Sequence, residues 1–267
     1  MIDPDNKTVQ SAITDVIQVN GSGAPPITAS PSIVDLANAA VAAAEGPGSR
    51  VLGTITADIT RAANEAGVED RGSESSLGSL VADMQLWATS ENPNYGGTPT
   101  QIAFMNPGGL RANLSYGTDG TVTYKQAAIV QPFANTLVTM TLTGAQIRQV
   151  LEEQWQPEGA SRAKLALGIS KGLSYTYVVD APRGSHIVDI AFNGAPLDES
   201  ASYRVVANSF LASGGDNFTT FAAGTDVSDS GLQSMIQKNF KAPTWINEVC
   251  RVLGGKGGGK VRIKKYE

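Results

Sequence analysis

Two arginines, each next to glycines, are the residues of this sequence best suited to bind a phosphate group. Arg71 stands in R-G-S-E-S-S-L-G, just before a predicted helix, where backbone N–H groups favour an anion. Arg111 ends M-N-P-G-G-L-R, whose paired glycines let the backbone approach a ligand closely, and Asn106 adds a neutral hydrogen-bonding group. Each segment also has a purely structural interpretation, a solvated arginine in the first case and an ordinary turn in the second.

Two aromatic residues and one acid could complete such a site. Phe133 lies in V-Q-P-F-A-N-T, whereas Phe210 and Asp216 lie in N-S-F-L-A-S-G-G-D-N-F. An aromatic face stacks on a planar base, and a carboxylate after a glycine turn can accept hydrogen bonds from two sugar hydroxyls. The alternatives are a core phenylalanine and a turn-forming aspartate. Together, groups suited to a phosphate, a ribose and a base indicate a nucleotide site. The segments that carry them are far apart in sequence, as is expected of the walls of a cleft.

The charge distribution argues against nucleic acid as a ligand. The 267-residue chain has a formal net charge of −5, but residues 231–267 contain eight Lys or Arg and two acids, so residues 1–230 are more acidic still. Binding to nucleic acid needs clustered cations, whereas one small phosphorylated ligand needs only two or three arginines. With 41% hydrophobic and 17% charged residues, the chain is predicted to fold around a buried core.

The scarcity of cysteine and histidine excludes several kinds of site. Cys250 is the single cysteine, so neither an intramolecular disulfide nor a thiol zinc site can form within the chain. His186 is the single histidine, which excludes a two-histidine metal motif, and its place in a strand pattern indicates a structural role. We expect no membrane span, and the N-terminus lacks signal-peptide character, so an exported protein would begin upstream of Met1.

Hydrophobic periodicity predicts an α/β (α+β) fold with a mixed β-sheet flanked by helices. Helices are expected over 33–44, 76–89 and 143–155. Strands are expected over 51–59, 102–105, 121–124, 136–142, 173–179, 186–192 and 203–207. Residues 1–30 end in a Gly- and Pro-rich stretch typical of a linker. One or two helices are expected over residues 231–253, and the glycine-rich, cationic residues 254–267 predict a flexible tail.

Five segments together resemble the C-terminal domain of 5′-nucleotidases, a family that includes UDP-sugar hydrolases and 2′,3′-cyclic phosphodiesterases. They occur in the family's order and spacing: R-G-S-E-S-S-L-G-S-L-V-A-D, M-N-P-G-G-L-R, Q-P-F-A-N-T-L, L-T-G-A-Q-I-R-Q-V-L-E and F-L-A-S-G-G-D-N-F. The resemblance implies a linker remnant over residues 1–30, a nucleotide-binding domain over 31–230, and a basic tail over 231–267, non-native or appended.

The resemblance also implies roles for individual residues. Phe133 and Phe210 are expected to clamp the base, and Asp216 to bind the ribose hydroxyls. Arg71 and Arg111 are expected to contact the phosphate and sugar, and Asn106 is expected to fix the nucleotide. Asn135 is expected to contact the base, and Gly172, on a looser match, is expected to offer a backbone contact.

The family's catalytic motifs have no match in this sequence. The resemblance implies that a calcineurin-like N-terminal domain supplies two divalent metal ions and a catalytic histidine in full-length members. Hydrolysis needs both ions. We therefore expect this chain to bind a nucleoside or nucleoside monophosphate without hydrolysing it, to hold no cofactor, and to work with that missing metallophosphatase domain. The parent protein is expected to be extracellular, periplasmic or on the cell surface.

Two alternatives remain open. In one, the chain is a scaffold or interaction module whose residues 231–267, with Trp245, Cys250 and the basic end, engage a protein partner. In the other, which has less support, it is a self-sufficient phosphatase with an unrecognised site.

Overall fold

The computed structural model describes residues 30–233 and 263–266 of the chain. The chain divides into two compact units, residues 1–46 and 47–267. Helix α1 (Pro31–Gly48) belongs mostly to the first unit and contains the predicted helix 33–44. None of the helices in the described residues is both long and apolar enough to cross a membrane.

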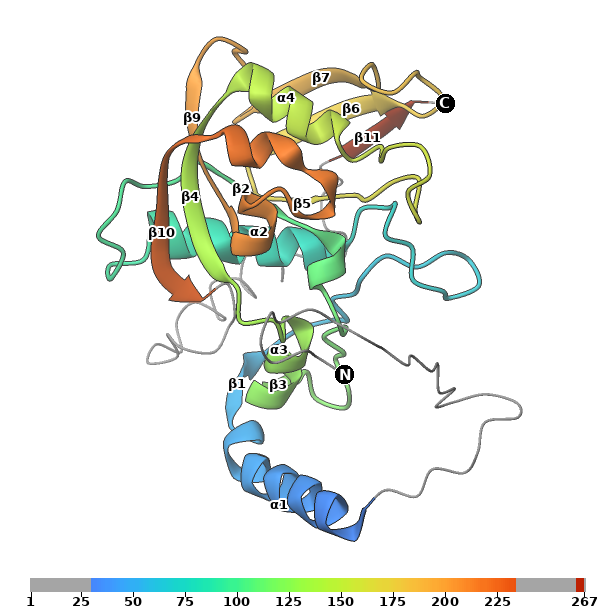
Figure 1. The fold of residues 1–267 in the computed structure, drawn as a ribbon, viewed down its shortest axis with the longest axis vertical. Helices are drawn as coiled ribbons and strands as arrows, with labels where there is room; N and C mark the ends of the chain where they lie inside the picture. The colour runs from blue at the N-terminus through green and yellow to red at the C-terminus, as the bar shows by residue number, and fades with distance from the viewer. Residues whose placement is uncertain (1–29, 234–262, 267) are drawn as a thin grey trace, which may run out of the picture. The chain divides into compact units, whose positions relative to one another are not determined.

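A five-stranded mixed sheet is the centre of the second unit. In spatial order, its strands are β10 (Thr225–Gln233), β4 (Thr136–Thr143), β9 (Ser202–Asn208), β2 (Ile102–Met105) and β5 (Gly168–Ile169). Strands β2 and β9 run parallel, and the other neighbours run antiparallel. With helices packed against it (Figure 1), this sheet confirms the predicted fold class.

Both faces of the central sheet are buried, which explains why β2 is apolar throughout. Ile102 and Phe104 pack in one hydrophobic cluster together with residues of helix α4 (Gly144–Glu152). Ala103 and Met105, which follow them in the strand, pack in a second cluster together with residues of helix α2 (Ser76–Ser90). Successive side chains of a strand point to opposite faces, so a strand covered on both sides needs apolar residues at every position.

Side-chain caps fix where the two flanking helices begin. The Ser75 Oγ accepts a hydrogen bond from the Gly78 N–H at the start of α2. At the start of α4, Thr143 and Gln146 form a capping box, in which each side chain bonds the other residue's backbone N–H. Such caps satisfy N–H groups that the helix itself leaves unpaired.

Two smaller sheets lie in the described part of the second unit. One has the order β11 (Ile263–Tyr266), β6 (Leu173–Val178), β7 (Ile187–Phe192) and β8 (Ala195–Pro196). The other pairs β1 (Val51–Thr54) with β3 (Thr121–Thr123), which leads into helix α3 (Tyr124–Val130).

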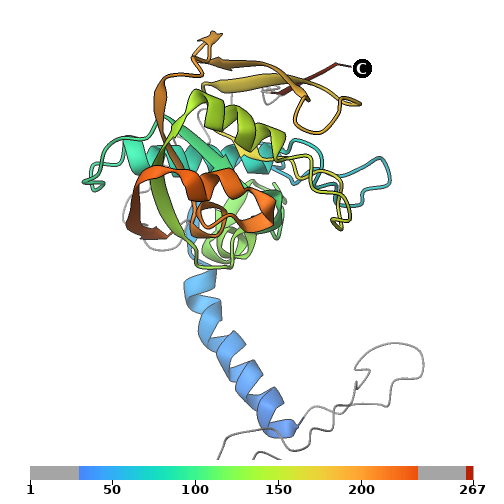
Figure 2. The same ribbon diagram turned by 45° about the horizontal axis from the view of Figure 1, so that its top comes forward.

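At the described residues, the structure corrects two predictions for the C-terminal segment, namely helices over 231–253 and a flexible tail over 254–267. Residues 231–233 continue β10, and residues 263–266 form β11, the dark red strand in Figure 2. Strand β11 pairs parallel to β6 with Ile263 opposite Tyr175. Strand pairing uses backbone groups, so a short, lysine-containing segment without clear periodicity can still pair at a sheet edge. Trp245 and Cys250 lie outside the described residues.

His186 is part of the interior, with 4% of its surface exposed. Its ring stacks on Trp155 with 3.9 Å between centroids, and its Nδ1 lies 3.4 Å from the Glu152 Oε2. The same carboxylate accepts hydrogen bonds from the backbone N–H groups of His186 and Ile187, at 3.1 and 2.6 Å. These contacts connect the end of α4 to β7, in agreement with a structural role for His186.

The crossing of α2 and β5 has no room for a side chain at Gly168. A Cβ built there would overlap the backbone of Gly78, which cannot move without moving the helix. We expect Gly168→Ala to lower the free energy of unfolding by about 2 kcal/mol, as overpacking does elsewhere. Chemical denaturation would measure this, with Gly96→Ala as the control because nothing lies within 4 Å of its Cβ position. Equal midpoints for the two variants would contradict the prediction.

Candidate functional site

Three strands of the central sheet bring the predicted site segments to one end of that sheet. Strand β2 leads directly into Asn106, and its parallel neighbour β9 ends at Asn208, next to helix α5 (Ser209–Ala212). Strand β4 runs the opposite way and pairs its Leu137 with Asn208, so residues 133–135 lie at this same end. The crevice beyond the carboxyl ends of parallel strands is where open α/β sheets commonly bind ligands.

Asp216 is held in a defined orientation at this end of the sheet. The Asn106 side chain, 3% exposed, donates from Nδ2 to the Asp216 Oδ2 at 2.8 Å. The turn that carries Asp216 has positive φ angles at Gly214 (86°), Asp216 (55°) and Asn217 (62°). Gln156 holds the turn in place by donating from Nε2 to the Asp216 carbonyl oxygen at 3.0 Å and accepting from Asn217 Nδ2 at 2.8 Å.

Arg71 belongs to the same cluster. A Cβ built on Gly108 would lie 3.4 Å from the Asp216 Oδ2 and 3.5 Å from both the Arg71 Nη1 and the Asn106 Nδ2. The side chains of Asp216, Arg71 and Asn106 therefore surround the point where a Cβ of residue 108 would lie. The guanidinium of Arg71 is oriented by Glu69, whose Oε2 accepts from the Arg71 Nε at 3.0 Å and whose Oε1 accepts from Arg61 at 2.7 Å.

Phe133 and Phe210 are exposed, unlike the other phenylalanines in the described part of the chain. Their exposed fractions are 55% and 43%, whereas Phe218 and Phe221 are fully buried. The Phe210 ring covers Gly215, where a Cβ would come within 2.5 Å of the ring. The alternative interpretation of Phe133 as a core residue is therefore wrong, because more than half of its surface is exposed to solvent.

Arg111 lies between the glycine pair and the aromatic segment. Its guanidinium carbon is 5.7 Å from the centroid of the Phe133 ring, within the range of a cation–π contact, and its Nη1 lies 3.4 Å from the Gly108 carbonyl oxygen. Asn135 is half-buried and follows Ala134, whose φ of 56° turns the chain sharply before β4. Seven of the eight predicted site residues thus come from segments that meet at one end of the sheet.

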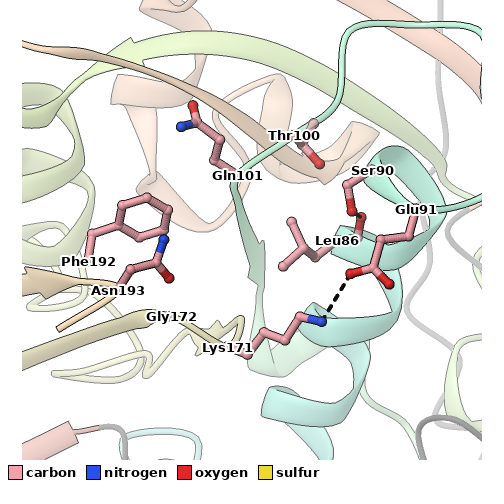
Figure 3. A pocket seen from close by; sticks show the side chains of 9 residues that line it. All are labelled: Leu86, Ser90, Glu91, Thr100, Gln101, Lys171, Gly172, Phe192 and Asn193. Carbon is pink, nitrogen blue, oxygen red and sulfur yellow. Dashed lines mark hydrogen bonds and ion pairs between the residues drawn. The ribbon is translucent and has the colours of Figure 1, made fainter.

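Gly172 is the exception. Strand β5 runs antiparallel to β2, with Gly168 opposite Met105 and Ile169 opposite Phe104, so the chain after β5 moves away from Asn106. Gly172 lies instead in a separate cleft of about 480 Å³ at the start of β2 (Figure 3). The cleft is lined by Leu86, Ser90, Glu91, Thr100, Gln101, Lys171, Gly172, Phe192 and Asn193. The structure therefore does not bring Gly172 to the Asp216 cluster.

Three residues that support the site were not identified from the sequence. Glu69 and Gln156 orient Arg71 and the Asp216 turn, and Asn208 donates from Nδ2 to the Asn106 Oδ1 at 3.0 Å. Only Asn208 carries a sequence signal, because an asparagine between a strand and a short helix is a typical N-cap. The partners of Glu69 and Gln156 are set by tertiary packing and cannot be read from local sequence.

The cluster offers hydrogen-bonding and stacking groups without a metal centre. Within residues 30–233, no group of three or more His, Cys, Asp or Glu side chains lies close enough together to hold a metal ion. The polar side chains that gather at this end of the sheet are a carboxylate, guanidinium groups and amides. What the residues of the cluster can do is accept hydrogen bonds at Asp216, attract an anion at two arginines, and stack on two phenylalanine rings.

Comparisons with known proteins point to one family. A family model described as the C-terminal domain of 5′-nucleotidases matches residues 51–223. A 5′-nucleotidase-related protein of Glossina morsitans morsitans is 36% identical over 160 residues, covering 55% of this chain and 28% of that protein. A cell wall protein of Listeria monocytogenes is 32% identical over 188 residues, covering 66% and 22%.

A solved structure gives the same result. The 5′-nucleotidase precursor of Thermus thermophilus is 29% identical to this chain with a TM-score of 0.62, and the match covers 88% of this chain and 42% of that structure. The chain thus spans about a quarter of the length of these two curated relatives and less than half of the solved structure.

Proposed function

This chain belongs to the 5′-nucleotidase C-terminal domain family, and from that premise we propose that it recognises the base and ribose of a nucleoside or nucleoside monophosphate. The observation that carries the proposal is the Asp216 carboxylate, held by Asn106 at 2.8 Å with Arg71 beside it. A carboxylate accepts hydrogen bonds at both oxygens, which suits the two adjacent hydroxyls of a ribose.

The remaining groups fit the other parts of a nucleotide. Arg71 and Arg111 are permanent cations near the Gly108 backbone, where they would attract a phosphate. The exposed rings of Phe133 and Phe210 suit the two faces of a planar base. Asn135, directly before β4 at this end of the sheet, is proposed to hydrogen-bond the base edge.

We propose that catalysis belongs to another domain of the parent hydrolase. A metallophosphatase domain with two divalent metal ions would cut the phosphoester, and the described residues of this chain would hold the substrate's nucleoside part. We also propose that the parent protein works outside the cytoplasm. The name of the Listeria monocytogenes relative, a cell wall protein, supports that location.

Calorimetric titration of adenosine and AMP into the purified chain tests this function. We expect weak binding, with a dissociation constant between about 10 µM and 1 mM, because a small ligand gains only a few hydrogen bonds and two stacking contacts. A chelator should leave the binding unchanged, and no phosphate should be released from AMP. The absence of any binding heat at millimolar nucleoside would contradict an autonomous site, and chelator-resistant phosphate release would favour a self-sufficient phosphatase.

The alternative function, a scaffold whose residues 231–267 engage a protein partner, falls largely outside the described residues. The described pieces of that segment, residues 231–233 of β10 and residues 263–266 of β11, pair with β4 and β6 of the same chain. The pairing of β11 supplies an intramolecular role for the basic end, so we propose nucleotide recognition as the function of this chain.

A further inference from the structure

Asn208 is a buried amide between the central sheet and the Asp216 cluster. Its exposed fraction is 1%, and it occupies the N-cap of α5, where its Oδ1 accepts from the Leu211 N–H at 3.0 Å. A backbone N–H can only donate, so this contact fixes which end of the amide faces the helix. The Nδ2 must then point the other way, where it donates to the Asn106 Oδ1 at 3.0 Å.

The orientation of Asn208 in turn determines that of Asn106. Because the Asn106 oxygen faces Asn208, its amide nitrogen faces Asp216 and donates to the carboxylate at 2.8 Å. The reversed amide would place a carbonyl oxygen against a carboxylate oxygen and the two NH₂ groups against each other. The surrounding hydrogen bonds are what decide the orientation of an asparagine side chain.

We propose that Asn208 is a positioning residue that orients the Asp216 carboxylate toward the ribose hydroxyls through Asn106. The relay has one direction: it begins at the Leu211 N–H, passes through two amides and ends at a carboxylate acceptor. The proposal rests on the proposed role of Asp216 in ribose binding. It adds that the affinity for ribose depends on a residue that touches no ligand.

The position of Asp216 explains why such a relay is needed. Asp216 lies in a short turn at a φ of 55°, outside any regular strand or helix. Gln156 fixes its backbone carbonyl, but among the described residues Asn106 supplies the hydrogen bond to its carboxylate. Without an oriented donor, the carboxylate could rotate about its side-chain bonds, and ordering it again would weaken binding.

Asn208→Asp tests the relay with little change in shape. An aspartate still accepts from the Leu211 N–H and is an equally good N-cap, but at neutral pH it cannot donate to Asn106. Adenosine and 2′,3′-dideoxyadenosine, which lacks the two adjacent hydroxyls at the 2′ and 3′ positions, would be titrated into wild type and variant by NMR. We expect the affinity for adenosine to fall about tenfold, because the hydrogen bonds from the ribose hydroxyls to the Asp216 carboxylate are weakened. The affinity for dideoxyadenosine, which cannot make these bonds, should change less than about twofold.

Two further variants separate the relay from other effects. Asn208→Ser retains an N-cap oxygen without adding charge, so it should show the same selective loss if the missing donor is the cause. Asn64→Asp is the matched control, since Asn64 uses its Oδ1 to accept from Ala66 and Val68 in an exposed turn. Thermal melts and amide spectra would establish that each variant is folded.

The outcomes are distinct. A purely structural role for Asn208 would lower both affinities together, and unchanged discrimination between the two nucleosides in Asn208→Asp and Asn208→Ser would overturn the proposal. If the wild-type chain bound neither nucleoside, or bound both equally, the proposed function of Asp216 would itself fail, and the relay with it. If Asn208→Asp failed to fold, the result for Asn208→Ser would decide.

Discussion

Asp216→Asn is expected to weaken adenosine binding by about 2 kcal/mol, which raises the dissociation constant roughly 30-fold. The substitution removes the charge and one acceptor where the ribose hydroxyls are proposed to bind. Asparagine tolerates the left-handed backbone at this position, where φ is 55°, so the turn should keep its shape. Isothermal titration calorimetry with adenosine measures the change.

Asp198→Asn is the matched control for this prediction. Asp198 is an exposed turn residue whose Oδ1 accepts from Ser200, and it is not part of the site. We expect its variant to bind adenosine as the wild type does. If Asp216→Asn bound as tightly as Asp198→Asn, the carboxylate would not be the ribose acceptor.

Phe210→Ala should reduce adenosine affinity by about 1–3 kcal/mol, the range found for stacking a base on an aromatic side chain. Ribose 5-phosphate, which has no base, should bind the variant and the wild type equally. Because 43% of Phe210 is already exposed, the variant should lose little stability. Phe133→Ala is expected to behave in the same way, and titrations with both ligands would measure the effects.

Phe218→Ala provides the contrasting result from the same segment. Phe218 is fully buried in the core, so its truncation should cost about 3–5 kcal/mol of stability, measured by chemical denaturation. A Phe210→Ala variant that lost stability to a similar extent, or that lost ribose 5-phosphate as well as adenosine, would show that Phe210 supports the fold and not the base.

The elements with strong hydrophobic patterns could be predicted from the sequence. The helix predicted over 76–89 is α2 (Ser76–Ser90), and the strand predicted over 102–105 is β2. Both have long or continuous apolar patterns because the core demands them. Strands β5 and β8, of two residues each, were missed because no periodicity exists over so short a length.

The candidate site could be predicted in part. Glycine pairs and nearby arginines stand out in the sequence, whereas the exposure of Phe133 and Phe210 is known only from the structure. The meeting of these segments at one end of the sheet depends on β2 and β9 running parallel, which no local pattern specifies. The resemblance places Gly172 in the site on a looser match, whereas the antiparallel direction of β5 carries it to the opposite end of the sheet.

A crystal structure of the chain with adenosine would test the proposed mode of nucleoside binding. We expect the base to contact the rings of Phe133 and Phe210, and the ribose hydroxyls to lie within hydrogen-bond distance of the Asp216 carboxylate. Adenosine bound in the cleft beside Gly172, or bound with its ribose away from Asp216, would contradict that mode.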